Sequence, residues 1–144
     1  MANTAKIKGS TYESKIATLL TKELKMEFKR VPLSGSIAYL KGDIWVPSDT
    51  AAFPYCIECK HYAEVPWNNL LTAKTSIILG FWEQTIREAT VMNKQPLLIY
   101  RWNRSKDYAC WNSDIELESQ ISYRGFGHTF KMGLLSDWIK EYKK

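Results

Sequence analysis

Long apolar runs are missing from this chain of 144 residues. No stretch approaches the ~20 apolar residues that a helix needs to cross a bilayer, so a membrane-spanning protein is excluded. The first ten residues also lack the hydrophobic segment of a secretory signal, which predicts a cytoplasmic protein. The hydrophobic share of 45% and the charged share of 24% are near globular averages, so we expect one folded domain over residues 1–144.

Cysteine is scarce, with three residues in the whole chain. Cys56-x-x-Cys59 has the spacing of a zinc or redox pair, but no second Cys/His pair accompanies it. The pair also falls inside a strand pattern rather than at the start of a helix. Free thiols in a reducing compartment are therefore the simpler interpretation.

Net positive charge is missing from the middle of the chain. Residues 1–30 carry seven basic and three acidic side chains, and residues 101–144 carry eight and six. Residues 31–100 carry five basic and six acidic side chains, although the whole chain has a net charge of +5. A basic rim around an acidic centre suits a polyanion gripped around a carboxylate site, although an ordinary basic protein has the same total.

Hydrophobic periodicity predicts an α/β (α+β) domain with a mixed central sheet flanked by helices. Helices are predicted at 11–25 and 75–92, a helical turn at 66–71, and a last helix capped around 135–137 and ending at 144. Strands are predicted at 26–31, 42–46, 55–60 and 95–100, with weaker candidates at 107–111 and 115–123. Residues 32–36 contain proline, glycine and two serines, which is typical of a loop.

Three residues carry the candidate chemistry: Asp43, Glu58 and Lys60. Glu58 and Lys60 are two apart on a predicted strand, so both side chains leave the same face, while Ile57 and Cys59 leave the other. A hairpin between the two predicted strands would bring Asp43 beside Glu58. Two converging carboxylates offer the oxygen ligands that Mg²⁺ prefers. A bound ion would polarise a phosphodiester and activate water, with the lysine orienting that water or neutralising charge.

The same residues have a simpler interpretation, an ordinary ion pair on an edge strand, because Asp followed by Glu-x-Lys recurs by chance. Gln84, on the predicted helix 75–92, either faces the site and positions water or is a solvated helix residue. Glu83 and Glu88 are predicted to form a charged helix surface. His61 is predicted to point away from the face of the candidate site, and His128 lies in a predicted turn.

Aromatic residues are abundant, with six tryptophans and eight tyrosines. Trp67, Trp102 and Trp111 stand beside polar or basic residues, so they belong to the core, to a dimer interface or to a surface that stacks on bases. Arg101 and Arg104 flank Trp102 and form one candidate phosphate-binding patch. A second candidate patch consists of basic residues near the N-terminus, which are Lys6, Lys8, Lys15, Lys29 and Arg30.

The motif Asp43…Glu58-Cys59-Lys60 resembles the PD-(D/E)xK nuclease signature, with Gly42 in place of the proline. Three further motifs stand before or around it in the chain: Lys8-Gly9-Ser10-x-x-Glu13, Arg30-x-Pro32-x-Ser34-Gly35-Ser36 and Gly42-Asp43-Ile44. In this order and spacing they resemble the archaeal-type Holliday junction resolvases, a family also found in phages. The resemblance covers residues 8–60 well and is looser from 67 to 100.

The resemblance implies a restriction-endonuclease-like core and a set of roles. Asp43 and Glu58 would be the core metal ligands, Glu13 an additional acidic residue that helps to bind metal, and Lys60 the catalytic lysine. Ser34 would be a catalytic serine in a flexible loop. The residues implied in DNA binding are Lys8, Lys29, Arg30 and Ser36.

The resemblance also implies a homodimer that depends on Mg²⁺, with Mn²⁺ as a substitute, and that selects four-way DNA junctions. Its place would be the cytoplasm, or the host cytoplasm if a phage encodes it. The expected function is therefore a metal-dependent, structure-selective endodeoxyribonuclease. Two alternatives stay open: another PD-(D/E)xK endonuclease of the restriction or repair type, and a DNA-binding module without catalysis.

Overall fold

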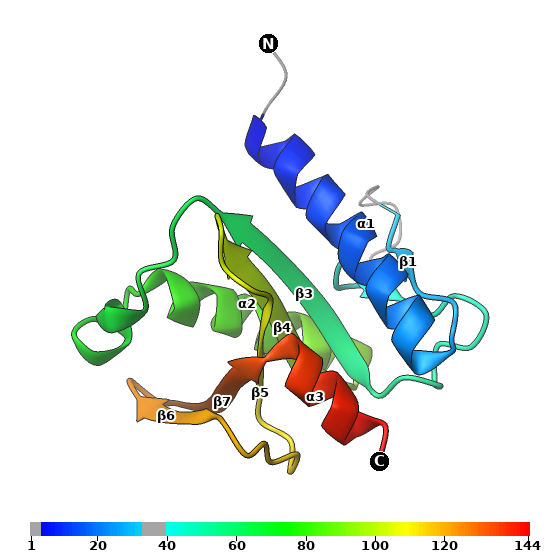
Figure 1. The fold of residues 1–144 in the computed structure, drawn as a ribbon. Coiled ribbons are helices and arrows are strands. Elements are labelled where there is room, and N and C mark those ends of the chain that lie inside the picture. Colours follow the sequence, from blue (N-terminus) through cyan, green and yellow to red (C-terminus); the bar gives the residue numbers. More distant parts are fainter. Residues whose placement is uncertain (1–3, 33–39) are drawn as a thin grey trace.

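A seven-stranded sheet forms the centre of the molecule (Figure 1). This computed structural model describes residues 4–32 and 40–144, with side chains from residue 9 onward. The strands lie in the order β1-β2-β3-β4-β5-β7-β6. The helices are α1 (Thr4–Leu24), η1 (Trp67–Leu71, a 3₁₀ helix), α2 (Ile77–Met92) and α3 (Leu135–Tyr142). The strands are β1 (Lys29–Arg30), β2 (Ile44–Trp45), β3 (Tyr55–Tyr62), β4 (Gln95–Trp102), β5 (Tyr108–Trp111), β6 (Ile121–Gly125) and β7 (His128–Leu134).

The central pair β3 and β4 is parallel, and the other pairs are antiparallel. Parallel neighbours need a long crossover, which here contains η1 and α2. Both strands are buried on two faces, which explains the nearly continuous apolar runs in their sequences. The predicted α/β architecture with a mixed sheet between helices is confirmed.

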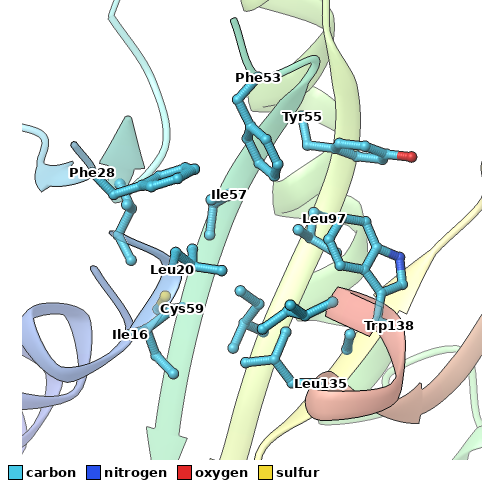
Figure 2. Packing of buried hydrophobic residues seen from close by; sticks show 14 of the residues in the cluster. Ile16, Leu20, Phe28, Phe53, Tyr55, Ile57, Cys59, Leu97, Leu135 and Trp138 are labelled. Carbon is cyan, nitrogen blue, oxygen red and sulfur yellow. The ribbon is translucent and has the colours of Figure 1, made fainter. Parts of the chain in front are cut away.

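One face of the sheet is covered by α1 and α3. Ile16 and Leu20 of α1 and Trp138 of α3 pack on the odd-numbered residues of β3 and β4, among them Ile57 and Leu97 (Figure 2). All five residues are fully buried, with an exposed fraction of 0%. This packing fixes α1 against β3, so the residues of α1 that face the sheet edge are held in place.

The opposite face is covered by α2. Trp82 and Leu79 of this helix pack on even-numbered sheet residues such as Leu98 and Cys110. Glu58 and Lys60 have the same parity in β3, so their side chains are directed to the α2 side of the sheet. A strand that carries ions toward a packed helix needs partners for them on that helix.

The N-terminal helix is longer than predicted, because it begins at Thr4 instead of residue 11. Gly9 and Ser10 lie inside it and do not start it. The structure also shortens the predicted strands 26–31 and 42–46 to Lys29–Arg30 and Ile44–Trp45. β1 is the edge strand, and β2 joins it to β3. The alternation of apolar and polar residues therefore extends beyond the residues that pair in the sheet.

The C-terminal third departs most from the prediction. The strand predicted at 115–123 is wrong, because residues 112–120 are irregular and β6 begins at Ile121. The strand β7 was not predicted, although it lies between β5 and β6. Phe126 and Gly127 form the hairpin turn, and His128, predicted as a turn residue, is the first residue of β7. The last helix begins at Leu135 without a side-chain cap, so the cap predicted at 135–137 is also wrong.

Among the described residues, no helix combines the length and the apolar character that crossing a membrane requires.

Candidate active site

The short strand β2 places Asp43 against the edge of β3. Asp43 N donates a hydrogen bond to Ile57 O at 2.8 Å, and Val31 N donates to Asp43 O at 2.8 Å. Cys59 N donates to the Asp43 carboxylate at Oδ2, over 2.7 Å. The predicted hairpin therefore brings Asp43 to β3, with its backbone and its side chain both anchored there.

Gly42 explains why this approach is so close. Its φ of 91° lies in the left-handed region, where side chains are strained. A Cβ at this position would also lie 2.9 Å from Ile57 O and 3.0 Å from Cys56 Sγ. Glycine is therefore required for Asp43 to meet β3 in this way, which accounts for glycine at the position that the nuclease signature gives to proline.

Glu58 and Lys60 form an ion pair beneath α2. Lys60 Nζ lies 3.4 Å from Glu58 Oε2, and the side chain of Glu58 is only 5% exposed. Gln84 Nε2 of α2 donates to the same oxygen at 3.2 Å. Lys60 Nζ also lies 5.4 Å from the ring centre of Phe81, within range of a cation–π contact. Gln84 therefore faces the site, and the alternative of an exposed ion pair is excluded by the burial of Glu58.

Glu13 reaches the site from α1. Arg30 Nε donates to Glu13 Oε1 at 3.2 Å, and another nitrogen of the same guanidinium donates to Ser10 Oγ at 3.2 Å. Burial and the nearby Asp43 charge raise the pKa of Glu13, while Arg30 opposes that shift. In this structure Arg30, predicted to contact phosphate, is thus turned to a carboxylate of the site.

Glu88 is a further carboxylate at Glu58. It lies one helical turn after Gln84 on α2, so the two side chains share a face. Glu88 Oε2 and Glu58 Oε1 are both buried, and in the described part of the chain neither has a donor other than a proton shared between the carboxyl groups themselves. The prediction of a charged surface is therefore wrong for Glu88. It holds for Glu83, which is 51% exposed and pairs with His128 at 3.8 Å.

Burial and crowding disfavour negative charge in this cluster. Burial, and then contact with Glu88 and Asp43, raise the pKa of Glu58 well above its ordinary value of 4.5. Burial also raises the pKa of Asp43, against the opposing effects of the Cys59 N–H and of Lys60. Asp43 and Glu58 thus share one half-buried lysine, Lys60, and an additional cation would favour the ionised form of both.

Comparison with known proteins agrees with this arrangement. Residues 4–137 match the family model described as "Phage putative PDDEXK endonuclease". The chain belongs to the phage PD-(D/E)xK endonuclease family. It is 32% identical to protein D14 of Escherichia phage T5 over 111 residues, which cover 74% of this chain and 69% of that protein. A fold comparison pairs it with Hjc, a Holliday junction resolvase of Archaeoglobus fulgidus, at 19% identity and a TM-score of 0.49, covering 90% and 91% of the two chains.

Nucleases of the PD-(D/E)xK type generally use divalent metals, so the fit of such an ion can be tested on the residues present. In residues 4–32 and 40–144, no three carboxylate, imidazole or thiol groups form a finished set of metal ligands. The donors are nevertheless of the right chemistry, because carboxylate oxygens suit Mg²⁺ and Mn²⁺. The buried, partnerless Glu58 Oε1 is an acceptor that needs a cation or a donor. The carboxylates present, and this oxygen in particular, therefore fit a divalent ion.

The structure does not bring every predicted site residue to this cluster. Ser34 and Ser36, and the side chain of Lys8, are outside the described residues. Lys29 is exposed and pairs with Glu27 at 3.5 Å. His61 contacts the ring of Tyr12, with centroids 5.3 Å apart, so it points to the α1 side as expected.

The three tryptophans separate by exposure. Trp111 is fully buried and belongs to the core, whereas Trp67 is 60% exposed. Trp102 lies between these extremes and stacks on Tyr108, with ring planes 6° apart.

Sequence reasoning missed one residue of the cluster, Glu88. A signal for it was present, because Gln84 and Glu88 are four apart on a predicted helix and so share a face. Once Gln84 is placed toward Glu58, the same face carries Glu88 with it.

Proposed function

We propose that this phage-family endonuclease is a metal-dependent, structure-selective endodeoxyribonuclease that resolves four-way DNA junctions. The observation that carries the nuclease chemistry is the group of Asp43, the buried Glu58 and the half-buried Lys60 on and beside β3. The choice of a four-way junction is supported by the resemblance of residues 8–60 to archaeal-type resolvases. The proposed setting is the cytoplasm of the host.

Each side chain has a task in this proposal. Asp43 and Glu58 hold the divalent ion, Mg²⁺ or Mn²⁺, which when bound polarises the scissile phosphodiester and lowers the pKa of a water molecule. Lys60, held in place by Glu58 and Phe81, neutralises the negative charge that develops on the phosphate. Gln84 orients Glu58 through its amide nitrogen.

The remaining carboxylates flank this pair from two helices. Glu13 of α1, next to Asp43 and fixed by Arg30, assists on one side. Glu88 of α2 assists on the other, where its partnerless oxygen adds a further anionic ligand atom. Ser34, from the segment before Asp43 that the sequence predicts to be a loop, would contact the phosphate.

A homodimer follows from the proposed reaction, because cutting two opposing strands needs two sites and a C2 dimer supplies them. Apolar side chains exposed on this chain support such an interface, among them Trp67 at 60%, Leu71 at 73% and Ile121 at 61% exposure. A groove of about 550 Å³ lies beside Trp67 and Ile121. It is lined mainly by aromatic and aliphatic residues, among them Trp102, and offers further apolar surface.

The deciding experiment incubates the protein with a labelled four-way junction, a linear duplex of the same sequence and a single strand, with Mg²⁺ or with chelator. We expect paired cuts in the junction only, with Mg²⁺ only, and none with Glu58→Gln. Equal cutting of duplex and junction would replace the resolvase with a general PD-(D/E)xK endonuclease. Absence of metal-dependent cutting of all three would overturn the nuclease.

A further inference from the structure

A second groove, separate from the apolar groove beside Trp67, lies on the opposite side of the sheet from Glu58 and Lys60. It has a volume of about 590 Å³ and lies between α1, α3 and the segment that joins β4 to β5. Lys15 lines it from α1, Arg101 from the end of β4, Lys106 from the segment after β4, and Lys140 from α3. Residues far apart in the chain thus direct four positive charges to one depression.

None of these four cations has an ion-pair partner among the described residues. Two carboxylates also line the groove, but both are engaged by other groups. Glu23 pairs with Lys143 at 3.5 Å, and Asp107 Oδ1 accepts a hydrogen bond from Tyr12 OH at 2.8 Å. The groove therefore carries four positive charges against two carboxylates, one of which already pairs with a lysine outside the lining.

The wall of the groove is ordered by hydrogen bonds of its own. Arg101 donates from one terminal nitrogen to Ser105 O at 3.2 Å, and Ser105 Oγ accepts from Trp102 N and donates to Lys106 O. Arg101 Nε is buried and has no acceptor. The guanidinium is thus held in place at one terminal nitrogen, in the lining of the groove, where its charge faces an incoming anion.

The start of α3 adds to this field. Leu135 and Ser136 line the groove, and no side chain caps the helix there. The positive end of the helix dipole thus adds to the positive charge of the groove. An apolar ligand would leave these donors unused, whereas a chain of phosphates, with an anionic group at each repeat, would use them.

The groove is joined to the candidate active site through α1 and β3. Tyr12, beside Glu13 in α1, donates to Asp107 at the groove and packs its ring on His61, which directly follows Lys60. In the β3–β4 register, Lys60 lies opposite Tyr100 and His61 lies opposite Arg101. Arg101 of the groove thus lies beside the residue that follows the proposed catalytic lysine, but its side chain leaves the other face of the sheet.

We infer that this groove binds the phosphodiester backbone of DNA outside the cleaved segment, through Lys15, Arg101, Lys106 and Lys140. The inference rests on the proposed function, because it takes the same DNA as its ligand. The groove holds a part of the DNA that the carboxylate cluster does not touch. Affinity for DNA depends on it through the release of counterions from the backbone.

The test compares two triple variants of equal charge. The groove variant is Lys15→Gln/Lys106→Gln/Lys140→Gln, and the control is Lys74→Gln/Arg87→Gln/Arg124→Gln. All six side chains are exposed, and none forms an ion pair in the described structure, so both variants are expected to fold. Melting curves check this. Arg101 is left unchanged because its hydrogen bond orders the groove wall.

The measurement is fluorescence anisotropy of a labelled junction and a labelled duplex in Ca²⁺, between about 50 and 200 mM salt. We expect the groove variant to lower the slope of log K against log salt by up to about 2.7, from three phosphate contacts at ~0.9 each. The control should keep the wild-type slope. Wild-type slope in the groove variant, or equal flattening in both variants, would overturn the inference.

The two proposals fail in different ways. A wild-type protein that binds DNA with the expected groove effect but does not cut it would overturn the nuclease and support the groove. A protein that cuts the junction but shows no groove effect would support the nuclease and overturn the DNA-binding role of the groove. A wild-type protein that does not bind DNA would overturn both.

Discussion

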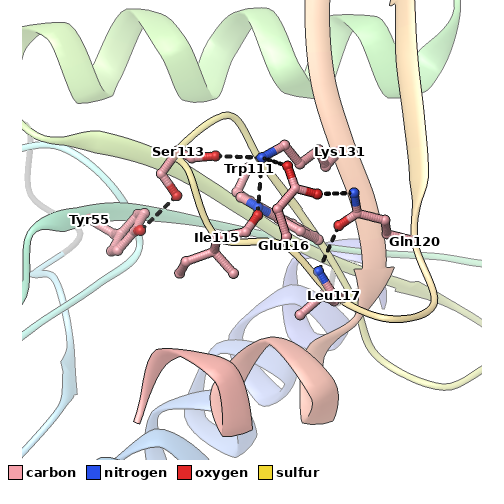
Figure 3. A network of polar contacts seen from close by, with 8 residues as sticks. All are labelled: Tyr55, Trp111, Ser113, Ile115, Glu116, Leu117, Gln120 and Lys131. Carbon is pink, nitrogen blue, oxygen red and sulfur yellow. Dashed lines mark hydrogen bonds and ion pairs between the residues drawn. The ribbon is translucent and has the colours of Figure 1, made fainter. Parts of the chain in front are cut away.

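Two polar clusters in this molecule contain similar side chains but differ in whether their hydrogen-bond acceptors have donors. In the C-terminal part, Lys131 Nζ donates to Ser113 O and Ile115 O at 2.8 and 3.0 Å and pairs with Glu116 at 3.0 Å (Figure 3). Gln120 completes this network by donating to Glu116 and accepting from Leu117 N. Each side-chain acceptor drawn there has a donor.

The carboxylate cluster beside β3 is built differently. Glu58 Oε2 accepts a hydrogen bond from Gln84 and pairs with Lys60, but among the described residues Glu58 Oε1 and Glu88 Oε2 are buried with no donor outside the carboxyl groups themselves. The C-terminal network therefore stabilises the irregular segment 112–120, whereas the carboxylate cluster costs stability until a cation binds. A satisfied network indicates structure, and a network with an excess of acceptors indicates a ligand.

The largest expected effect comes from Glu58→Gln. This change removes a ligand charge while it keeps the size of the side chain, so cleavage should fall to background. Binding of a junction in Ca²⁺ should stay within about twofold of wild type, because backbone contacts supply most of the affinity. Cleavage in Mg²⁺ and anisotropy in Ca²⁺ measure the two effects. Near-wild-type cutting would remove Glu58 from the proposed site.

Glu88→Gln should have the next largest effect. It removes one of two facing acceptors, so we expect Mn²⁺ affinity, measured by calorimetry without DNA, to fall by about 10–100-fold. Glu83→Gln is the matched control on the same helix, because Glu83 is 51% exposed and pairs with His128. The control should leave the affinity unchanged. Equal results for both variants would return Glu88 to the helix surface.

Lys131→Met tests the satisfied network. The change deletes an ion pair and two hydrogen bonds from a side chain that is 19% exposed. Hydrogen bonds of charged groups contribute roughly 1.5–3 kcal/mol, so we expect about 2 kcal/mol lower stability in urea titration. The cleavage rate well below the melting temperature should not change. Lys74→Met serves as the exposed control, and a stability equal to that control would contradict the expectation.

A smaller effect should follow from pH. Because the pKa of Glu58 is raised in the folded protein, the folded state keeps a proton that the unfolded chain releases above its ordinary value of 4.5. The stability contribution is therefore fully present below that value and is lost as the pH rises toward the raised pKa.

Divalent metal binds the ionised form, so Mg²⁺ should raise the melting temperature more at about pH 8 than at about pH 6. Thermal melts with Mg²⁺ and with chelator at both pH values measure this. Glu58→Gln is the control, in which the difference should shrink. An effect of Mg²⁺ that is independent of pH would show that it binds elsewhere.

Glu116→Gln should have the smallest effect. Glu116 is 65% exposed in its ion pair with Lys131, and such pairs contribute little in water. We expect the midpoint of urea unfolding to stay at the wild-type value within experimental error. A loss as large as that of Lys131→Met would mean that the two clusters are less different than they look.

How far the sequence determines this structure varies along the chain. The β3 residues Glu58 and Lys60 could be placed on one face from their spacing alone, because a strand alternates strictly. Gln84 stayed ambiguous, since helix periodicity gives its face but not the distance from that face to the sheet. Glu88 was misplaced for the same reason. Its partner lies 30 positions earlier in the chain, and only the packing of α2 on β3 brings the two together.

The C-terminal region was harder for another reason. The β7 sequence contains Phe130 and Met132 in alternation, which indicates a strand, but nothing local shows that it pairs with β5 on one side and β6 on the other. The irregular segment 112–120 resembles a strand in composition. Its conformation depends on Lys131, which lies more than ten residues away.

The bond from Cys59 N to the Asp43 carboxylate has a consequence for solubility. The strand β2 is only two residues long, so beyond it the outer edge of β3 would offer an unpaired N–H to a strand of another molecule. Asp43 fills that position with a charged side chain. The residue proposed to bind metal thus also closes the sheet edge against self-association. Replacement by asparagine keeps an acceptor there, whereas alanine leaves the edge open.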